Sequence, residues 1–186
     1  MTVREILIFP QYKTELRRKS AVVAGLDYKL RQLIRDLKDT LQASADGIGL
    51  AAPQINVHQR VVIVYLGNET NGEWQAGSPV ALINPVIVEA SEERRDFDGC
   101  LSLPGLYGNT NRPHHLHVTG LDEGGKPFDQ VYDGFNAVVV HHEIDHLDGV
   151  LFIDRIENLQ DLFTLGNDEH GKVVRIPFTA SSLSGG

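Results

Sequence analysis

Hydrophobic residues recur every three or four positions between residues 24 and 46, with charged residues between them. Residues at this spacing share one face of an α-helix, so the segment is predicted to be an amphipathic helix that packs through that face. Its apolar positions are Leu26, Leu30, Leu33, Ile34, Leu37 and Leu41. Asp46 and Gly47 mark the end of this helix.

Four later segments have the composition of β-strands, because they are rich in β-branched or aromatic residues and are bounded by turn-forming residues. They comprise residues 61–67, 80–90, 116–122 and 126–132. A second helix is predicted for residues 134–147, with Asp133 as its N-cap and Gly149 as its terminator. A short helix is expected in IENLQDLF (156–163), and the tail from about residue 179 has the composition of a flexible end.

The order of helix, several strands and helix lacks the regular alternation of βαβ units. We therefore predict an α+β fold in which mostly antiparallel sheets pack around the second helix, with the amphipathic helix on the N-terminal side. The sequence contains no repeat and no low-complexity linker. Residues 1–186 are accordingly predicted to form a single domain, which agrees with the usual size of a domain.

Composition and charge exclude several classes of function. A formal net charge of −8 argues against broad binding to nucleic acid or to anionic membranes, since both are polyanionic. No apolar stretch approaches the length of a membrane span or of a signal sequence. The single cysteine cannot form an internal disulfide, so a reducing compartment, the cytoplasm, is the expected location.

The second predicted helix contains the sequence HEIDH, in which His142 and His146 lie four residues apart. This spacing places both imidazoles on one helix face, where they can bind one metal ion, with Glu143 beside them as a general base. The alternative is a pair of ordinary helix histidines, because a motif with three fixed positions also occurs by chance. A metal site of this kind requires a third protein ligand.

Several residues are candidates for the third ligand. The protease pattern HExxHxxGxxH would supply its last histidine, but that position holds Phe152. A glutamate from further along the chain would be Glu157 or Glu169, and neither has a persuasive context. Cys100 is the only cysteine, and a thiolate is a strong ligand for zinc or iron(II). The alternative for Cys100 is a buried free thiol that packs as a small hydrophobic residue.

Two other sequences suggest sites that their context does not favour. GIGLAAPQ (47–54) fits the dinucleotide pattern GxGxxA, but it follows a helix and contains Pro53, whereas that pattern must follow a strand and open a helix. The histidines of HHLH are better explained as polar positions at the end of a strand than as metal ligands. These are His114, His115 and His117.

Three motifs nevertheless occur in the order and at the separations of the peptide deformylase family. GIGLAAPQ resembles the family motif GxGLAAxQ, DGCLS (98–102) resembles EGCLS, and HHEIDH (141–146) resembles QHExDH. LINP (82–85), Arg112 and LFID (151–154) extend the similarity over most of the chain. The family hydrolyses the formyl group from the N-formylmethionine of newly made polypeptides and releases formate, so the resemblance implies the same reaction here.

The resemblance also implies a metal site in which Cys100, His142 and His146 bind one divalent ion, with water as the fourth ligand. The ion is usually iron(II) in the family, and zinc, nickel or cobalt can replace it. The implied substrates are N-formylmethionyl nascent peptides, and the exit region of the ribosome is a further expected partner.

Roles for the remaining motif residues follow from the same resemblance. Glu143 would take a proton from the metal-activated water and deliver it to the leaving amine. The side-chain amide of Gln54 and the backbone N–H of Leu101 would stabilise the developing oxyanion. Gly49 would let the backbone pass close to the substrate.

An apolar slot is needed for the methionine side chain, and Ile48, Val138 and Val139 are its predicted walls. Simple core packing is the alternative interpretation of these three residues.

Two positions depart from the family pattern. Asp98 replaces the glutamate of EGCLS with a shorter side chain, so its expected contact with Arg112 beside the metal would be lengthened or rerouted. His141 replaces the glutamine before HExDH and is expected to tune the rate or the metal affinity without abolishing activity.

Two other functions remain open at this point. A catalytically weakened relative that binds peptide N-termini would not need Glu143, which is present. A different HExxH metallopeptidase is disfavoured by Phe152.

Overall fold

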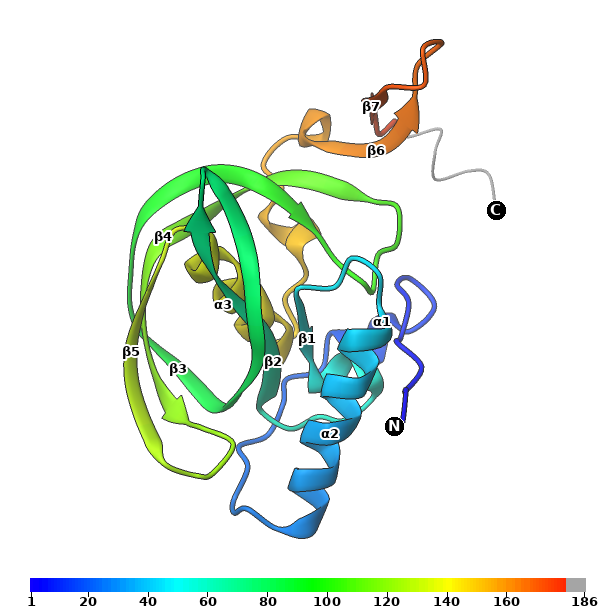
Figure 1. Ribbon diagram of the computed structural model, residues 1–186. Coiled ribbons are helices and arrows are strands. Elements are labelled where there is room, and N and C mark those ends of the chain that lie inside the picture. The colour runs from blue at the N-terminus through cyan, green and yellow to red at the C-terminus, as the bar shows by residue number, and fades with distance from the viewer. Residues whose placement is uncertain (180–186) are drawn as a thin grey trace.

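The computed structural model describes residues 1–179, and its helices and strands are drawn in Figure 1. The helices are α1 (Lys13–Leu16), α2 (Tyr28–Ala43) and α3 (Phe135–Leu147), with 3-10 turns at η1 (Ala52–Ile55), η2 (Phe152–Arg155) and η3 (Leu159–Asp161). The strands are β1 (Gly49–Ala51), β2 (Val61–Thr70), β3 (Glu73–Gly99), β4 (Tyr107–Leu121), β5 (Pro127–Asp133), β6 (Leu162–Asn167) and β7 (Val173–Pro177).

These strands form one sheet in the order β1-β2-β3-β4-β6-β7, with β5 paired to β4. Every pairing between the named strands is antiparallel. The sheet curves, and α3 lies inside the curve of β3, β4 and β5 (Figure 1). The prediction of a mixed helix and antiparallel sheet fold is therefore confirmed.

Strand β2 separates two hydrophobic clusters. Val61 and Ile63 belong to the cluster under α2, while Val62 and Val64 belong to the cluster under α3. Because neighbouring side chains of a strand point to opposite faces, an unbroken apolar run is what a strand buried on both faces requires. Helices α2 and α3 thus pack on opposite sides of the same strand.

Helix α2 forms where the apolar periodicity predicted it. Asp27 caps its N-terminus, and its carboxylate accepts a hydrogen bond from the backbone N–H of Leu30 at 2.8 Å. The helix ends at Ala43, shortly before Asp46. Its leucines pack against β1, β2 and β3.

Helix α3 differs at its start from the prediction. Its N-cap is Gly134, with φ 57° and no side-chain cap, so the prediction of Asp133 as N-cap was wrong. Asp133 is the last residue of β5, and its carboxylate contacts Nδ1 of His115 at 2.8 Å. The end of the helix agrees with the prediction, because Gly149 adopts φ 74° directly after it.

The predicted segments 61–67 and 80–90 lie within β2 and β3, and the segments 116–122 and 126–132 match parts of β4 and β5 to within one residue, but β3 and β4 extend far beyond the prediction. The extensions of β3 are mostly exposed and polar, and the extension of β4 carries buried or half-buried polar residues, so both lack the apolar signal by which a strand is found in sequence. Strands β1, β6 and β7 were not predicted. Most of the helix predicted for 156–163 is absent, because only Leu159–Asp161 forms a helical turn and β6 begins at Leu162.

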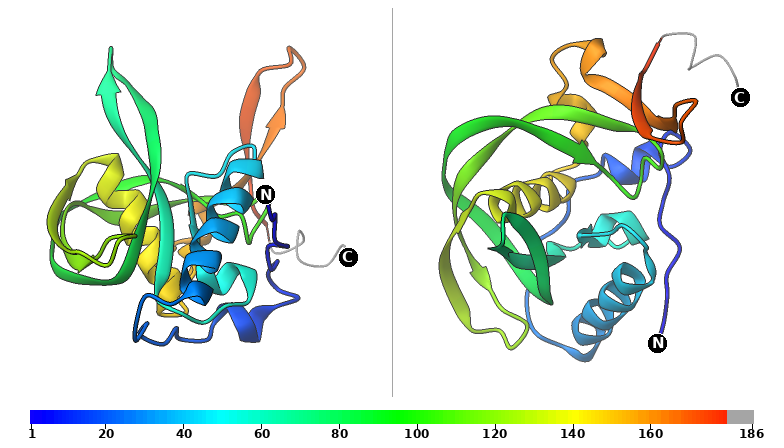
Figure 2. Two further views of the ribbon diagram at one scale, coloured as in Figure 1. Left: turned by 60° about the horizontal axis from the view of Figure 1, so that its bottom comes forward. Right: turned by 45° about the horizontal axis from the view of Figure 1, so that its top comes forward.

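Two hairpins, β2–β3 and β6–β7, project from the same side of the molecule (Figure 2, left). The first is anchored on α3 through Asn136, whose side chain accepts from Nε1 of Trp74 at 3.0 Å and bonds to both backbone groups of Gly67. Trp74 also packs edge-on against Phe135, with ring centroids 5.1 Å apart.

Within residues 1–179, no helix is long and apolar enough to cross a membrane. The tail was predicted to be flexible from about residue 179. Beyond Thr179 it lies outside the described residues.

Candidate metal centre

Helix α3 and the end of β3 bring three potential ligands together. Cys100 directly follows β3, and its Sγ lies 3.2 Å from Nε2 of His146. One ligand atom each from Cys100, His142 and His146 lies within 4.8 Å of the other two. This is the only such group of three His, Cys, Asp or Glu side chains among residues 1–179. The donor set of one thiolate and two imidazoles suits a divalent transition metal.

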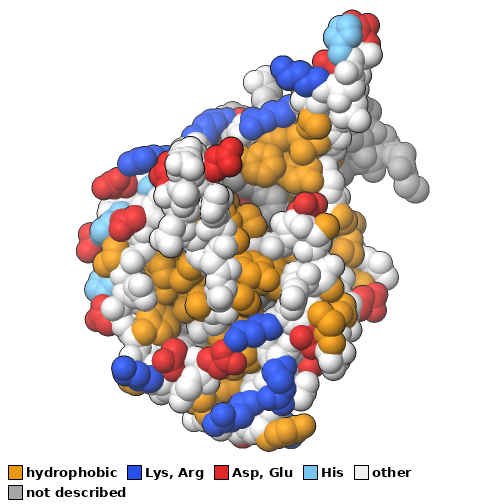
Figure 3. All heavy atoms as spheres, in the orientation of Figure 1, with side chains coloured by type: hydrophobic (Ala, Val, Ile, Leu, Met, Phe, Trp, Pro, Cys, Tyr) orange, Lys and Arg blue, Asp and Glu red, His pale blue; other side chains and the backbone are white. Residues whose placement is uncertain are grey.

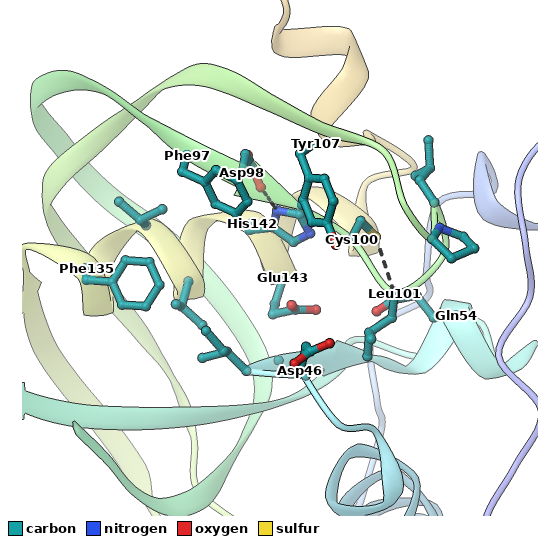
Figure 4. Close-up of a pocket in the computed structure, with 18 of the residues that line it drawn as sticks. Asp46, Gln54, Phe97, Asp98, Cys100, Leu101, Tyr107, Phe135, His142 and Glu143 are labelled. Carbon is teal, nitrogen blue, oxygen red and sulfur yellow. Dashed lines mark hydrogen bonds and ion pairs between the residues drawn. The ribbon is translucent and has the colours of Figure 1, made fainter. Parts of the chain in front are cut away.

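Cys100 and His142 line a cavity of about 350 Å³ (Figure 4). Its apolar wall consists of Ile48, Phe97, Leu101, Leu103, Tyr107, Phe135, Val138 and Val139. Its polar groups include Asp46, Gln54, Cys100, His142 and Glu143. The structure therefore brings Cys100, His142, the predicted base and the three predicted slot residues to one cavity, and His146 lies next to Cys100.

Glu143 lies at the centre of this cavity (Figure 4). It is 4% exposed, and its Oε2 has no hydrogen-bond partner among the described residues. Burial raises the pKa of Glu143 to about 7. A side chain with this pKa exchanges a proton readily near neutral pH, which is what a general acid–base catalyst requires.

Gly49 is packed against Glu143. A Cβ at this position would overlap the Glu143 carboxylate and its adjoining carbons. The glycine predicted to allow close approach of substrate thus also leaves the space that the glutamate side chain occupies.

Gln54 is fixed with its amide group beside Cys100. Its Oε1 accepts from the backbone N–H of Ala51 at 2.8 Å. Its Nε2 donates to Oγ of Ser102 at 3.1 Å and to Sγ of Cys100 at 3.6 Å. Because the carbonyl oxygen is held by the backbone, the amide N–H groups are directed toward the cysteine. Leu101 follows Cys100 and lines the cavity with it.

Asp98 orients His142. Its Oδ1 lies 2.8 Å from Nδ1 of His142, and its Oδ2 accepts from Nε of Arg112 at 2.7 Å and from Thr110 at 2.8 Å. An ionised carboxylate only accepts hydrogen bonds, so Nδ1 of His142 donates and Nε2 is left to bind a metal. The contact with Arg112 is direct although aspartate is shorter than the glutamate of the family motif.

The protonation states of Asp98, His142 and His146 depend on one another and on the charge of Arg112. Burial alone would raise the pKa of Asp98, but His142 and Arg112 hold it well below its usual range. Burial alone would lower the pKa of His142, but Asp98 holds it well above its usual value, so a metal ion would displace a proton from this ring. Burial and the charge of His142 lower the pKa of His146, which favours its neutral, ligating form.

His141 lies on the opposite side of Arg112 from the metal ligands. Nη1 of Arg112 is 2.7 Å from Nδ1 of His141 and donates to Oδ2 of Asp145 at 2.7 Å. Arginine only donates hydrogen bonds, so Nδ1 of His141 is the acceptor. Burial lowers the pKa of His141 to about 4, which agrees with a neutral ring.

Asp145 and Arg155 were not assigned a role from the sequence. Asp145 accepts from Arg155 at 2.6 and 2.7 Å as well as from Arg112. Asp145 is the aspartate of HExDH, so the motif contained the signal for it. Arg155 follows LFID and carried no signal of its own.

The other metal-ligand candidates lie elsewhere. The HHLH histidines each face an aspartate, in the pairs His114–Asp96, His115–Asp133 and His117–Asp129. Glu157 accepts from Asn111, and Glu169 contacts the neighbouring His170. Phe152 is fully buried in a small hydrophobic cluster.

An HExxH helix with a further potential ligand close to its two histidines is typical of metal-dependent hydrolases. Comparison with known sequences identifies the member of this class. The profile of the polypeptide deformylase family matches residues 3–161, so the chain belongs to that family. This confirms the resemblance seen in the motifs, and the activity of the chain is removal of the formyl group from nascent peptides.

Individual relatives agree with this assignment. "Peptide deformylase 1" of Pseudomonas syringae pv. tomato is 41% identical over 161 residues, which cover 86% of this chain and 90% of the relative. A peptide deformylase of Thermomicrobium roseum is 42% identical over 169 residues, covering 91% and 94%.

Solved structures of deformylases share the fold. The enzyme from Legionella pneumophila is 37% identical with a TM-score of 0.73, over 85% of this chain and 88% of that one. A deformylase from Acinetobacter baumannii, solved with bound Met-Ala-Ser, is 32% identical with a TM-score of 0.75, over 83% and 99%.

Proposed function

We propose that Sγ of Cys100 and Nε2 of His142 and His146 bind the single divalent metal ion of this deformylase. The proposal is supported by the mutual distances of at most 4.8 Å and by the orientation of His142 through Asp98. Iron(II) is the proposed ion in the cell, and zinc, nickel or cobalt should substitute. A bound ion would polarise the formyl oxygen and lower the pKa of a water molecule.

Glu143 is the proposed proton carrier. Its carboxylate would take a proton from the attacking water and pass it to the amine nitrogen of methionine as the bond to the formyl carbon breaks. The observation that carries this role is its burial beside the ligands, with an unpartnered Oε2 and a pKa raised to about 7 by that burial. A protein that only binds peptide N-termini would not need such a group.

Gln54 and Leu101 are the proposed oxyanion donors. The Gln54 amide is held next to Cys100, and Leu101 follows the cysteine on the cavity wall. Donors fixed before the reaction stabilise developing charge without reorganisation.

Ile48, Val138 and Val139 are proposed to contact the methionine side chain, since all three line the cavity with Glu143. Val138 and Val139 are only 4% and 7% exposed, which gives an apolar wall. Gly49 would lie beside the substrate backbone. The Acinetobacter deformylase was solved with Met-Ala-Ser bound, which supports a peptide beginning with methionine as the ligand.

We further propose that residues 1–186 act as one catalytic domain in the cytoplasm on N-formylmethionyl peptides at the ribosome exit. A different HExxH metallopeptidase is disfavoured, because the position of a third protease histidine is occupied by the buried Phe152.

The test compares Glu143→Gln and Cys100→Ala with the unmutated protein under anaerobic conditions. Glu143→Gln should retain about one metal ion per chain and release formate from formyl-Met-Ala at least ~100-fold more slowly. Cys100→Ala should lose the metal. Glu157→Gln is the control, since this exposed carboxylate bonds only to Asn111.

Full activity of Glu143→Gln would refute the proposed base. If the unmutated protein released no formate with any of the four metals, the enzymatic assignment itself would fail.

A further inference from the structure

The β6–β7 hairpin lies outside the segment that matches the deformylase family, which ends at residue 161. It nevertheless touches the wall of the cavity. Phe163 of β6 lies 5.9 Å from Phe97 and 6.3 Å from Tyr107 between ring centroids, and both of these residues line the cavity. The hairpin therefore adds this chain's own residues to the site.

Three aromatic side chains, Phe97, Tyr107 and Phe163, form a continuous row that begins beside Cys100 and is called the aromatic path below. Gly99, the neighbour of Cys100, pairs with Tyr107, and Tyr107 pairs with Phe163. The Phe97 and Tyr107 rings stack with centroids 5.2 Å apart, and both lie on the same rim of the cavity (Figure 4). Phe97 is 41% exposed, so this path reaches the surface.

Arg175 of β7 covers the outer end of this path. Its guanidinium lies 4.4 Å from the ring centroid of Phe163 and 5.9 Å from that of Phe97. Nη1 donates to Oδ1 of Asn109 at 3.2 Å, and no ion pair within residues 1–179 includes Arg175. Arginine has five N–H donors, so several remain for a ligand.

The neighbouring arginine of this surface is already paired. Arg95 contacts the carboxylate of Asp161, whereas Arg175 has no acidic partner in the described chain. Figure 3 shows a hydrophobic patch at the base of the projecting hairpin, bordered by lysine or arginine side chains. An exposed apolar surface beside a guanidinium that has no acidic partner among residues 1–179 matches a side chain with a methylene stem and a carboxylate.

We propose that Phe97, Tyr107 and Arg175 form a subsite for a residue downstream of the formylmethionine, and that this subsite favours glutamate or aspartate. The inference rests on the proposed placement of the formyl group at Cys100 and Glu143. Phe97 and Tyr107 line the cavity, and the Arg175 guanidinium lies 5.9 Å from the Phe97 ring centroid, so a residue beyond methionine that leaves the cavity over Phe97 meets Arg175. The methylene stem packs on Phe97, and the carboxylate pairs with the guanidinium.

The negative net charge of the protein means that a preference for acidic peptides would point to a local positive charge at the site. A net charge of −8 repels an acidic peptide, so faster processing of acidic peptides requires a local cation.

The experiment measures kcat/KM for formyl-Met peptides that carry glutamate or glutamine at the second, third or fourth residue. For each variant, kcat/KM for the glutamate peptide is divided by kcat/KM for the glutamine peptide. A general loss of activity lowers both values and leaves this Glu/Gln ratio unchanged. We expect a ratio of about 3- to 10-fold at one position, falling toward one at high salt. Arg175→Gln should reduce it to about one, and Arg175→Lys should leave an intermediate value.

Arg94→Gln is the matched control, because it removes an equal charge from β3 at an exposed side chain paired with Glu92. It should keep the unmutated ratio. A ratio of one at every position in the unmutated protein, or an unchanged ratio in Arg175→Gln, would overturn the subsite. Failure to hydrolyse any formyl peptide would instead refute the proposed site at Cys100.

Discussion

Arg112 shows how a single buried side chain organises this site. It is fully buried and bonds to Asp98 on one side and to His141 and Asp145 on the other. The motifs identified Arg112 and Asp98, but sequence alone could not show what His141 does. The structure gives His141 a specific role, because its ring accepts a hydrogen bond that glutamine could also accept.

The role of His141 as acceptor can be tested by two substitutions. His141→Gln keeps an acceptor, so the free energy of unfolding should change by less than about 1 kcal/mol. His141→Leu leaves a buried Arg112 N–H without that partner and should cost about 1–3 kcal/mol. Urea denaturation of both variants measures this difference. Equal free energies of unfolding for the two variants would show that the hydrogen bond from Arg112 to residue 141 does not stabilise the protein.

The close packing of Gly49 against Glu143 can be tested by a single substitution. Gly49→Ala places a methyl group against Glu143, so the carboxylate must move. Formate release should fall by about 10- to 100-fold, because small displacements of a catalytic group are costly. Gly25→Ala is the control, since a Cβ there meets no atom within 4 Å. Unchanged activity in Gly49→Ala would mean that Glu143 tolerates the displacement.

Among the elements, the two long helices were the most predictable from sequence. Their signals are local, because helix α2 follows a 3.6-residue apolar period and helix α3 ends at a glycine with positive φ. Strand β6 was missed because its pairing with β4 joins residues far apart in the chain, such as Tyr107 and Phe163, and β7 in turn pairs with β6. The N-cap of α3 was missed because Asp133 is used by β5.

The N-cap of α2, Asp27, is expected to stabilise this helix. Asp27→Ala removes the acceptor for the N–H of Leu30 and should lower the free energy of unfolding by about 1 kcal/mol. Asp27→Asn can still accept this hydrogen bond and should be close to neutral. Thermal denaturation of the two variants distinguishes them. An equal loss in both would indicate that charge, rather than the hydrogen bond, matters.

At the scale of the whole molecule, the complete set of proposed metal ligands could be predicted from sequence only through the order of the motifs. HEIDH identified two of them, and Cys100 followed from the family resemblance. The supporting partner Arg155 could not be found, because it reaches Asp145 from the 3-10 turn η2 after α3. Specific three-dimensional contacts of this kind leave no periodic pattern in sequence.

Arg17 and Asp154 join the N-terminal segment to the turn that follows α3. The carboxylate also accepts from the N–H of Leu151 at 2.8 Å. Partial burial alone would raise the pKa of Asp154, but the hydrogen bonds from Arg17 and Leu151 lower it below its usual value. Its contribution to stability is therefore present above the unfolded pKa of about 3.9 and is lost as the pH falls through the lower folded pKa.

Asp154→Asn should consequently reduce the free energy of unfolding at pH 7 by about 1 kcal/mol or less, since the pair is half exposed. The difference from the unmutated protein should be smaller at about pH 3 than at pH 7, because pH 3 lies below the unfolded pKa of about 3.9. Urea titrations at the two pH values test this. A difference that grew on acidification would contradict the direction of the pKa shift.

Trp74 is the only tryptophan in the chain, and its ring rests on Phe135 at the wall of the cavity. The intrinsic fluorescence of this protein therefore comes from one indole that neighbours the place where ligands enter. A peptide or inhibitor that displaces Phe135 should change the emission of Trp74. Occupancy of the site can then be followed optically in unlabelled protein, in real time and without turnover.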